Sequence, residues 1–155
     1  MNFLIVTGLS GAGKSMAVNA LEDIGFFCID NIPAGLLPRI LDFAQQGENQ
    51  LSRVAVVMDI RGLHSVQETN EALEALDEKK MPYDILFLDA SDAAIRRRYK
   101  ETRRVHPMTI SEGIPVSEAI TKERQILQPL RERAKYVIDT SLLSTAQNRE
   151  RVSSL

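Results

Sequence analysis

Residues 8–15 constrain the fold of this chain more than any other stretch. They form a glycine-rich segment that closes on a lysine and a serine: Gly8-Leu9-Ser10-Gly11-Ala12-Gly13-Lys14-Ser15. This is the pattern G-x-x-x-x-G-K-S of the phosphate-binding P-loop, or Walker A motif. An apolar run precedes it at residues 3–6, and a helical apolar pattern follows at residues 16–24. The sequence therefore predicts a buried strand, a loop and a helix, which is the context in which this motif binds phosphate.

The residue types of the loop explain the expected chemistry. Gly8, Gly11 and Gly13 let the backbone curl, so that successive N–H groups point at an anion. The first turn of the following helix adds unpaired N–H groups and the positive end of its dipole. Lys14 is expected to contact the β and γ phosphates, and the Ser15 hydroxyl to bind Mg²⁺. A glycine-rich turn without a ligand is disfavoured because the motif is complete and correctly placed.

Composition excludes several other classes of protein. The chain has 155 residues, which suggests one domain, and a net charge of −2, which gives no overall field to attract nucleic acid or an anionic membrane. No stretch is long and apolar enough to span a bilayer, so we expect no membrane association and a cytoplasmic location. The single cysteine, Cys28, is interpreted as a buried hydrophobe, and His64 and His106, which lack metal-ligand companions, as loop residues.

Strand and helix patterns alternate along the whole chain. Apolar runs predict strands at residues 3–6, 26–29, 54–58, 85–88 and 136–138. Helical patterns predict helices at residues 34–46, 65–79 and 116–133, one after Asp89 capped by Ser91 or Asp92, and one that starts at Ser144, with a loop at 105–115. Alternation of this kind predicts an α/β fold. We expect a three-layer α/β/α P-loop NTPase fold of the kinase-like type, with a central, mainly parallel five-stranded sheet.

Four of the predicted strands end in an aspartate. These residues are Asp30, Asp59, Asp89 and Asp139. The ligand of an open α/β sheet binds at the carboxyl ends of the strands, and an aspartate after an apolar strand is the Walker B pattern that orients Mg²⁺. Spacing alone does not choose between Asp59 and Asp89, and we favour Asp59. The alternative is that these aspartates only cap the turns that follow them.

A run of cations at residues 96–104 leaves three interpretations open. It is a solvated helix end, a lid whose arginines close over phosphates, or a nucleic-acid patch in which Tyr99 stacks on a base. Helical spacing divides the cations, so the run cannot point wholly at one ligand. One face would hold Arg97, Lys100 and Arg104, and another Arg96 and Arg103.

Several blocks together resemble one known family. Besides the P-loop they are Ala20 to Gly25, Cys28-Ile29-Asp30-Asn31-Ile32-Pro33, Asp59-Ile60-Arg61, Leu86-Phe87-Leu88-Asp89-Ala90 and Arg97 to Pro107. The chain is similar over nearly its whole length to the RapZ/YvcJ family of bacterial P-loop proteins, also called RNase adapter proteins. The resemblance implies that ATP and GTP are bound and slowly hydrolysed.

The resemblance also assigns roles to residues. The ATP site would be Gly8, Leu9, Ser10, Gly11, Ala12, Gly13, Lys14 and Ser15, and the segment assigned to GTP would be Asp59, Ile60, Arg61 and Gly62. Together with the motif analysis, this gives Lys14 and Asp59 as expected catalytic residues and Ser15 and Asp59 as expected Mg²⁺ ligands.

Two classes of function stay open at this point. In the resembling family a C-terminal domain carries the RNA-binding and sugar-phosphate-sensing elements, so residues 1–155 are expected to be the N-terminal nucleotide-binding domain, with the C-terminal domain absent. The full-length protein would bind small regulatory RNA, present it to an endoribonuclease and control glucosamine-6-phosphate synthesis; homo-oligomer formation stays open. The alternative is a small-molecule or nucleotide kinase with an acceptor pocket near Asp30. No acceptor-binding motif is evident there, so we favour regulation.

Overall fold

The computed structural model describes residues 3–30, 32–45, 53–60, 62–80 and 82–155. Within these ranges five strands form one sheet in the order β2-β3-β1-β4-β5, and all four neighbouring pairs are parallel. The strands are β1 (Phe3–Gly8), β2 (Phe27–Ile29), β3 (Val54–Val57), β4 (Asp84–Asp89) and β5 (Tyr136–Asp139). The α/β fold class predicted from the alternating pattern is confirmed.

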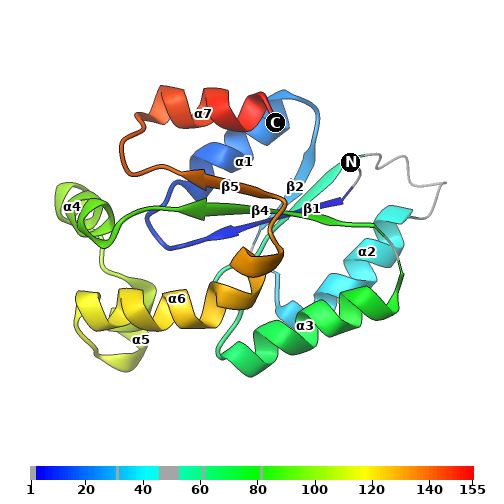
Figure 1. Ribbon diagram of the computed structural model, residues 1–155, viewed down its shortest axis with the longest axis horizontal. Helices are drawn as coiled ribbons and strands as arrows, with labels where there is room; N and C mark the ends of the chain where they lie inside the picture. The colour runs from blue at the N-terminus through cyan, green and yellow to red at the C-terminus, as the bar shows by residue number, and fades with distance from the viewer. Residues whose placement is uncertain (1–2, 31, 46–52, 61, 81) are drawn as a thin grey trace.

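Helices cover both faces of the sheet. They are α1 (Lys14–Asp23), α2 (Leu37–Gln45), α3 (Val66–Glu78), α4 (Asp92–Thr102), α5 (Pro107–Glu112), α6 (Val116–Arg133) and α7 (Thr145–Ser153), with a 3₁₀ turn η1 (Ala34–Leu36) before α2. Figure 1 shows α1 and α7 over one face and α2, α3 and α6 over the other, while α4 lies beyond the carboxyl ends of β4 and β5. The structure therefore has the predicted three layers.

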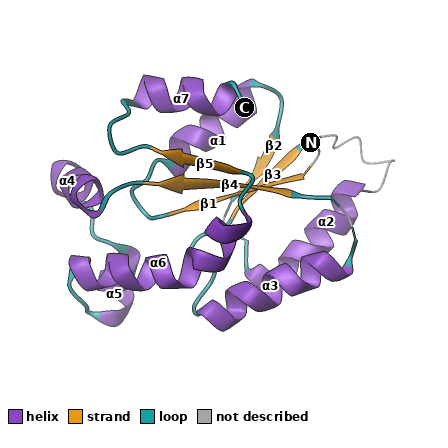
Figure 2. Ribbon diagram, in the orientation of Figure 1, coloured by secondary structure: helices purple, strands orange, loops and turns teal. Residues whose placement is uncertain are grey.

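The two central strands β1 and β3 are buried and position the P-loop. Every residue of β1 and of β3 is buried, as expected for parallel strands that are covered by helices on both faces. Strand β1 lies in the middle of the sheet, and the chain crosses from one side of it to the other between β3 and β4. A reversal of strand order is where open α/β sheets bind their ligands. The loop after β1 therefore starts at the centre of the binding edge, as Figure 2 shows.

Serine side chains fix the starts of three helices. Ser65, Ser91 and Ser144 each accept a hydrogen bond from a backbone N–H in the first turn of α3, α4 and α7. The expectation that Ser91 or Asp92 caps the helix after β4 is therefore met by Ser91. Among the described residues, no helix is both long and apolar enough to cross a membrane.

The prediction of an unbroken loop at residues 105–115 is wrong. Helix α5 lies inside it, with the His106 side chain as N-cap, Pro107 in the first turn and Gly113 in the left-handed conformation at the end (φ 68°). Proline at the start of a helix and glycine just after its end are common signals. The predicted helix at 34–46 is also divided into η1 and α2, and its last residue lies outside the described residues.

Candidate nucleotide site

The P-loop wraps the end of β1 against the neighbouring strand. A Cβ at Gly8 (φ +146°) would lie 2.2 Å from the Leu88 carbonyl oxygen, so no larger residue fits there. The Leu9 N–H donates to the same carbonyl at 3.2 Å, and the Ala12 N–H donates to the Leu9 carbonyl at 3.0 Å. These contacts fix a tight turn that delivers the chain to the start of α1 at Lys14.

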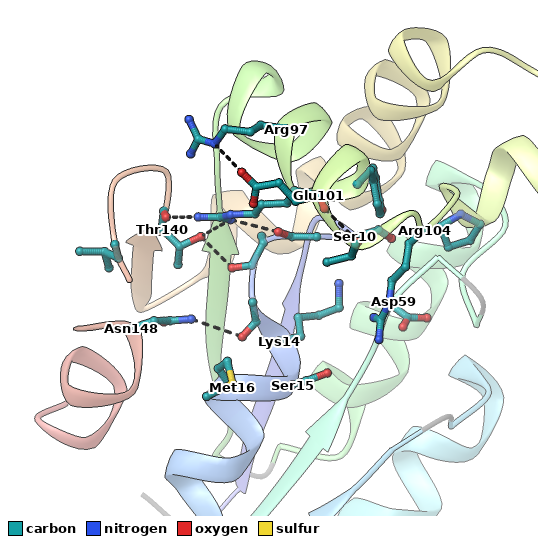
Figure 3. A pocket seen from close by; sticks show the side chains of 18 of the residues that line it. Ser10, Lys14, Ser15, Met16, Asp59, Arg97, Glu101, Arg104, Thr140 and Asn148 are labelled. Carbon is teal, nitrogen blue, oxygen red and sulfur yellow. Dashed lines mark hydrogen bonds and ion pairs between the residues drawn. The ribbon is translucent and has the colours of Figure 1, made fainter. Parts of the chain in front are cut away.

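Lys14 lies over the loop that it follows. Its Nζ donates hydrogen bonds to the carbonyl oxygens of Gly8 at 2.9 Å and Leu9 at 3.0 Å. Figure 3 shows this side chain on the pocket side of the loop. The ammonium group is therefore already placed beside the N–H groups that would surround a phosphate.

A cavity of about 970 Å³ opens at this edge of the sheet. Four parts of the chain line it: the P-loop with the start of α1, the ends of two strands, α4 with the segment after it, and the connection from β5 into the first turns of α7. The lining residues are Ser10, Gly11, Ala12, Gly13, Lys14, Ser15, Met16, Asp30, Asp59, Arg97, Arg98, Tyr99, Glu101, Thr102, Arg104, Val105, Pro107, Thr140, Leu143, Ser144 and Asn148. Six of the eight predicted P-loop residues thus line one cavity, while Gly8 and Leu9 are buried behind it.

The four strand-end aspartates separate into two groups. Asp30 and Asp59 line the cavity, and Asp89 and Asp139 do not. The Asp89 carboxylate accepts hydrogen bonds from Arg124 Nη1 at 3.0 Å and Arg131 Nε at 3.2 Å. Asp89 therefore neutralises two arginines of α6 in this structure and does not face the P-loop.

Asp139 closes the turn after β5. Its carboxylate accepts hydrogen bonds from the Ser141 hydroxyl at 2.5 Å and the Ser141 N–H at 2.9 Å. These two hydrogen bonds hold the pKa of Asp139 below its usual value. For this aspartate the structure shows the turn-capping role that was the alternative to metal binding.

The segment assigned to GTP by resemblance is only partly in the cavity. Asp59 lines it, Ile60 is 8% exposed in the hydrophobic core, and the Gly62 N–H donates to the Asp59 carbonyl at 3.0 Å to close a turn. Gly62 is not among the lining residues, and Arg61 lies outside the described residues. Among the described residues of this segment, Asp59 is the one that lines the cavity together with the P-loop.

The cations at residues 96–104 are divided between different contacts. Arg97, Arg98 and Arg104 line the cavity, whereas Arg96 donates to the Ser117 hydroxyl. The predicted pairing of Arg104 with Lys100 on one helical face is wrong, because α4 ends at Thr102 and Arg104 lies beyond it. Figure 3 shows Arg104 reaching from the end of this helix into the cavity, toward Asp59.

Arg98 joins α4 to the P-loop. Its guanidinium donates to the Gly11 carbonyl and to the Thr140 hydroxyl, both at 3.0 Å, and also to the Thr140 carbonyl. The Thr140 hydroxyl in turn donates to the Ala12 carbonyl at 2.7 Å. Burial lowers the pKa of Arg98, with a further contribution from Arg97. Thr140 has no sequence signal besides its position directly after β5.

Tyr99 does not fit the role of a base-stacking residue. It is 9% exposed, and a Cβ at Gly11 would lie 3.5 Å from its Cζ atom. Its ring meets the His106 ring edge-on, with 5.9 Å between the centroids. Burial, together with the negative charge of Glu123, raises the pKa of its hydroxyl. Tyr99 packs against Gly11 at the edge of the cavity, and its burial disfavours stacking on an RNA base, one of the three interpretations left open by the sequence.

A buried carboxylate that sequence analysis missed holds the start of the loop. Glu123 of α6 is fully buried and accepts hydrogen bonds from the Ser10 N–H at 3.0 Å and the Ser10 hydroxyl at 2.6 Å. His106 is also fully buried, and its Nε2 lies 3.0 Å from Glu123 Oε1. His106 lies in the loop between α4 and α5, as expected, but its side chain is buried in the structure. A separation of 113 residues between Ser10 and Glu123 left no local signal for this contact.

Cys28 and His64 lie outside the site. Burial, with a smaller effect of Glu22, raises the pKa of the Cys28 thiol to about 11, and the side chain packs against the core. His64 is exposed, and its Nδ1 lies 3.4 Å from Glu68. Neither residue lines the cavity.

The residues present suit a magnesium ion that shares its ligands with a nucleotide. Across the described residues no group of three or more histidine, cysteine or acidic side chains could hold a metal alone. Mg²⁺ prefers oxygen ligands and is commonly held by one or two protein groups together with phosphates and water. The Ser15 hydroxyl and the Asp59 carboxylate both supply oxygen atoms to this cavity, so they fit such an ion.

Comparison with known proteins identifies relatives of this chain. The sequence matches the RapZ-like N-terminal domain family over residues 1–155. A nucleotide-binding protein of Moorella thermoacetica is 50% identical over 156 residues, and one of Alkaliphilus oremlandii is 44% identical over 155 residues. These alignments cover 98% and 100% of this chain but 51% and 53% of the relatives. The chain thus spans about half the length of the curated relatives it matches.

Solved structures share the fold at low identity. The tunicamycin resistance protein of Deinococcus radiodurans has a TM-score of 0.63 at 15% identity, covering 98% of this chain and 93% of that one. A gluconokinase of Sinorhizobium meliloti has a TM-score of 0.58 at 16% identity, with coverages of 99% and 90%. These likenesses confirm the kinase-like α/β fold. Because the family match extends over residues 1–155, the chain belongs to the RapZ-like N-terminal domain family.

Proposed function

We propose that this chain binds a magnesium–nucleoside triphosphate, ATP or GTP, with its phosphates in the P-loop, and hydrolyses it slowly. The observation that carries this proposal is one cavity lined jointly by residues 10–15 of the P-loop, by Asp59 and by three arginines from the α4 side, Arg97, Arg98 and Arg104. Membership of a family whose curated relatives are called nucleotide-binding proteins supports it.

Each group in the cavity has a role in this proposal. The loop N–H groups and the start of α1 would hold the phosphate oxygens, and Lys14 would neutralise part of their charge. Ser15 and Asp59 would hold Mg²⁺, which when bound supplies positive charge to the phosphate oxygens. Arg104 extends toward Asp59 and would add charge from the opposite wall, as arginines do in phosphoryl transfer.

The nucleotide site would serve a longer regulatory protein. We propose that the full-length protein is a cytoplasmic RNase adapter that binds small RNA, presents it to an endoribonuclease and so controls glucosamine-6-phosphate synthesis. The resemblance in sequence supports this role, and so does the coverage of about half of each relative, which leaves room for an RNA-binding domain. We expect residues 1–155 alone to bind RNA much more weakly, because the net charge is −2 and Tyr99 is buried.

A small-molecule kinase is the second candidate. One observation favours it: Asp30 lines the same cavity as Lys14 and Asp59, so a carboxylate stands near the expected phosphates where it could accept a proton from a hydroxyl. Hydrolysis and phosphoryl transfer would share the P-loop and Mg²⁺ and differ only in the acceptor.

Turnover in the presence of acceptors separates the two candidates. ATP and GTP would be incubated with Mg²⁺ and the chain, with and without a panel of nucleoside monophosphates, sugars and hydroxy acids. We expect slow release of inorganic phosphate that no acceptor changes and that Lys14→Ala abolishes. Strong stimulation by one acceptor, with phosphate transferred to it, would establish the kinase and reject the regulatory hydrolase.

A further inference from the structure

A cluster of buried polar side chains lies behind the P-loop and has no part in the proposed function. Glu123 of α6, His106 and Ser10 meet there, and both Glu123 and His106 are 0% exposed. The partners are far apart in the chain, 113 residues between Ser10 and Glu123 and 17 between His106 and Glu123. An ionised carboxylate is costly to bury unless hydrogen bonds satisfy it, so each of its donors has to be identified.

Three donors satisfy the Glu123 carboxylate. The Ser10 N–H lies 3.0 Å from each of its oxygens, and the Ser10 hydroxyl donates to Oε2 at 2.6 Å. His106 Nε2 lies 3.0 Å from Oε1. The Met108 N–H donates to His106 Nδ1 at 3.0 Å, so the hydrogen-bond pattern assigns the ring proton to Nε2, from which it is donated to Glu123. The cluster is thus a neutral histidine that orients a carboxylate, which in turn orients a loop serine.

The same carboxylate connects two walls of the nucleotide cavity. Ser10 belongs to the P-loop, which holds the expected phosphates. His106 directly follows Arg104 and Val105, which line the opposite wall, and its side chain also caps α5. The position of Arg104 relative to the loop is therefore fixed at one buried point on α6.

We propose that Glu123 is a positioning residue that holds the P-loop and the Arg104 segment in the shape that accepts a nucleotide, and that His106 orients it. This inference rests on the proposed function. A loop that is already in its binding conformation loses less conformational freedom when the ligand arrives, and this preorganisation appears as affinity. The Ser10 N–H and hydroxyl both donate to Glu123, and neither Glu123 nor His106 lines the cavity, so these two residues act on the loop from behind.

Glu123→Gln is the direct test, because it keeps the size of the side chain and removes its charge. The amide nitrogen of glutamine can only donate, so it cannot replace the carboxylate between donors from Ser10 and His106. We expect the Kd for Mg-ATP, measured by titration calorimetry at a temperature where the variant is folded, to rise about tenfold, the size of one lost hydrogen bond to a charged group. Glu118→Gln, an exposed residue of the same helix, should leave the Kd unchanged.

A second control separates positioning from a general loosening of α6. Thr69 is fully buried on α3 and donates to the Ile126 carbonyl of α6 at 2.9 Å. Thr69→Ala should lower the unfolding temperature without weakening nucleotide binding by the folded protein. His106→Gln keeps a donor toward Glu123 and should retain most of the affinity, whereas His106→Ala should behave like Glu123→Gln. Ser10→Ala removes only the hydroxyl donor and should give a weakening of a few fold, even where Glu123→Gln does not fold.

The outcomes distinguish this inference from the proposed function. A wild-type chain that binds no Mg-nucleotide would reject the proposed function and the inference with it. Wild-type binding together with a folded Glu123→Gln variant of unchanged Kd would overturn the inference alone. Equal weakening by Thr69→Ala and Glu123→Gln would also overturn it, because the effect would then come from α6 as a whole.

Discussion

Strands β3 and β4 each lead to an aspartate at the same edge of the sheet, and the two aspartates have different surroundings. Asp59 follows β3 and lines the nucleotide cavity with Lys14 and Ser15. Asp89 ends β4, is turned toward α6 and is paired with Arg124 and Arg131. The sequence before each is an apolar run, so the difference comes from what other elements bring to the strand end. The contacts of a strand-end carboxylate are therefore set by the elements that pack around it and not by the strand that precedes it.

The largest effect should come from Asp59→Asn. This change keeps the shape of the side chain and removes the negative charge that would hold Mg²⁺. We expect Mg²⁺-dependent turnover of ATP and GTP to fall about 10²-fold, the usual size when one electrostatic contact to the transition state is lost. Steady-state phosphate release measures it. If Asp89→Asn lowered turnover as much, the contrast between the two aspartates would be wrong.

Asp89→Asn should reduce stability instead of turnover. It leaves the Arg124 and Arg131 guanidinium groups without their shared carboxylate. Their side chains are 35% and 46% exposed, so water partly compensates and the loss is limited. We expect the free energy of unfolding to fall by about 1–2 kcal/mol. Urea denaturation followed by circular dichroism measures the loss; a normal stability combined with lost turnover would reverse the roles given to Asp89 and Asp59.

The smallest effect should come from Asp139, and it should depend on pH. Hydrogen bonds from Ser141 lower the pKa of Asp139 in the folded state. A carboxyl group with a lowered pKa stabilises the fold above its unfolded pKa, which is about 3.9, and loses that contribution as the pH falls through the folded value. Asp139 is exposed, so we expect only about 0.5 kcal/mol.

Unfolding of wild type and Asp139→Asn between pH 6 and pH 2.5 checks this expectation. The stability gap between them should close toward low pH, and turnover at neutral pH should be equal. A gap that widens on acidification would show that Asp139 is not stabilised as the carboxylate.

The fold could be predicted because its signals are local. The P-loop pattern, five apolar runs and the caps at Ser91 and Ser144 each lie within a few residues of the structure they specify. Helix α5 was missed although it carries a local signal, proline at its start and Gly113 after its end. It is six residues long, and its apolar pattern is too short to recognise as a helix.

The site could be predicted only where one segment supplies it. Residues 10–15 follow from the motif, whereas the pairing of Asp89 depends on Arg124 and Arg131, which come 35 and 42 residues after it. Glu123 and Thr140 contact the P-loop across 113 and 128 residues. No spacing rule along the sequence reports such contacts, because they arise only when α6 packs on the sheet and β5 pairs with β4.

Thermal unfolding of the wild type and Lys14→Ala with Mg-ATP and Mg-GTP tests the central claim most directly. A ligand at a hundredfold excess over its Kd should stabilise the wild-type chain by about 2.7 kcal/mol, which appears as a rise in Tm. We expect Lys14→Ala to lose this rise while its Tm without nucleotide stays close to that of the wild type. An equal rise in both proteins would contradict the assignment of the nucleotide to the P-loop.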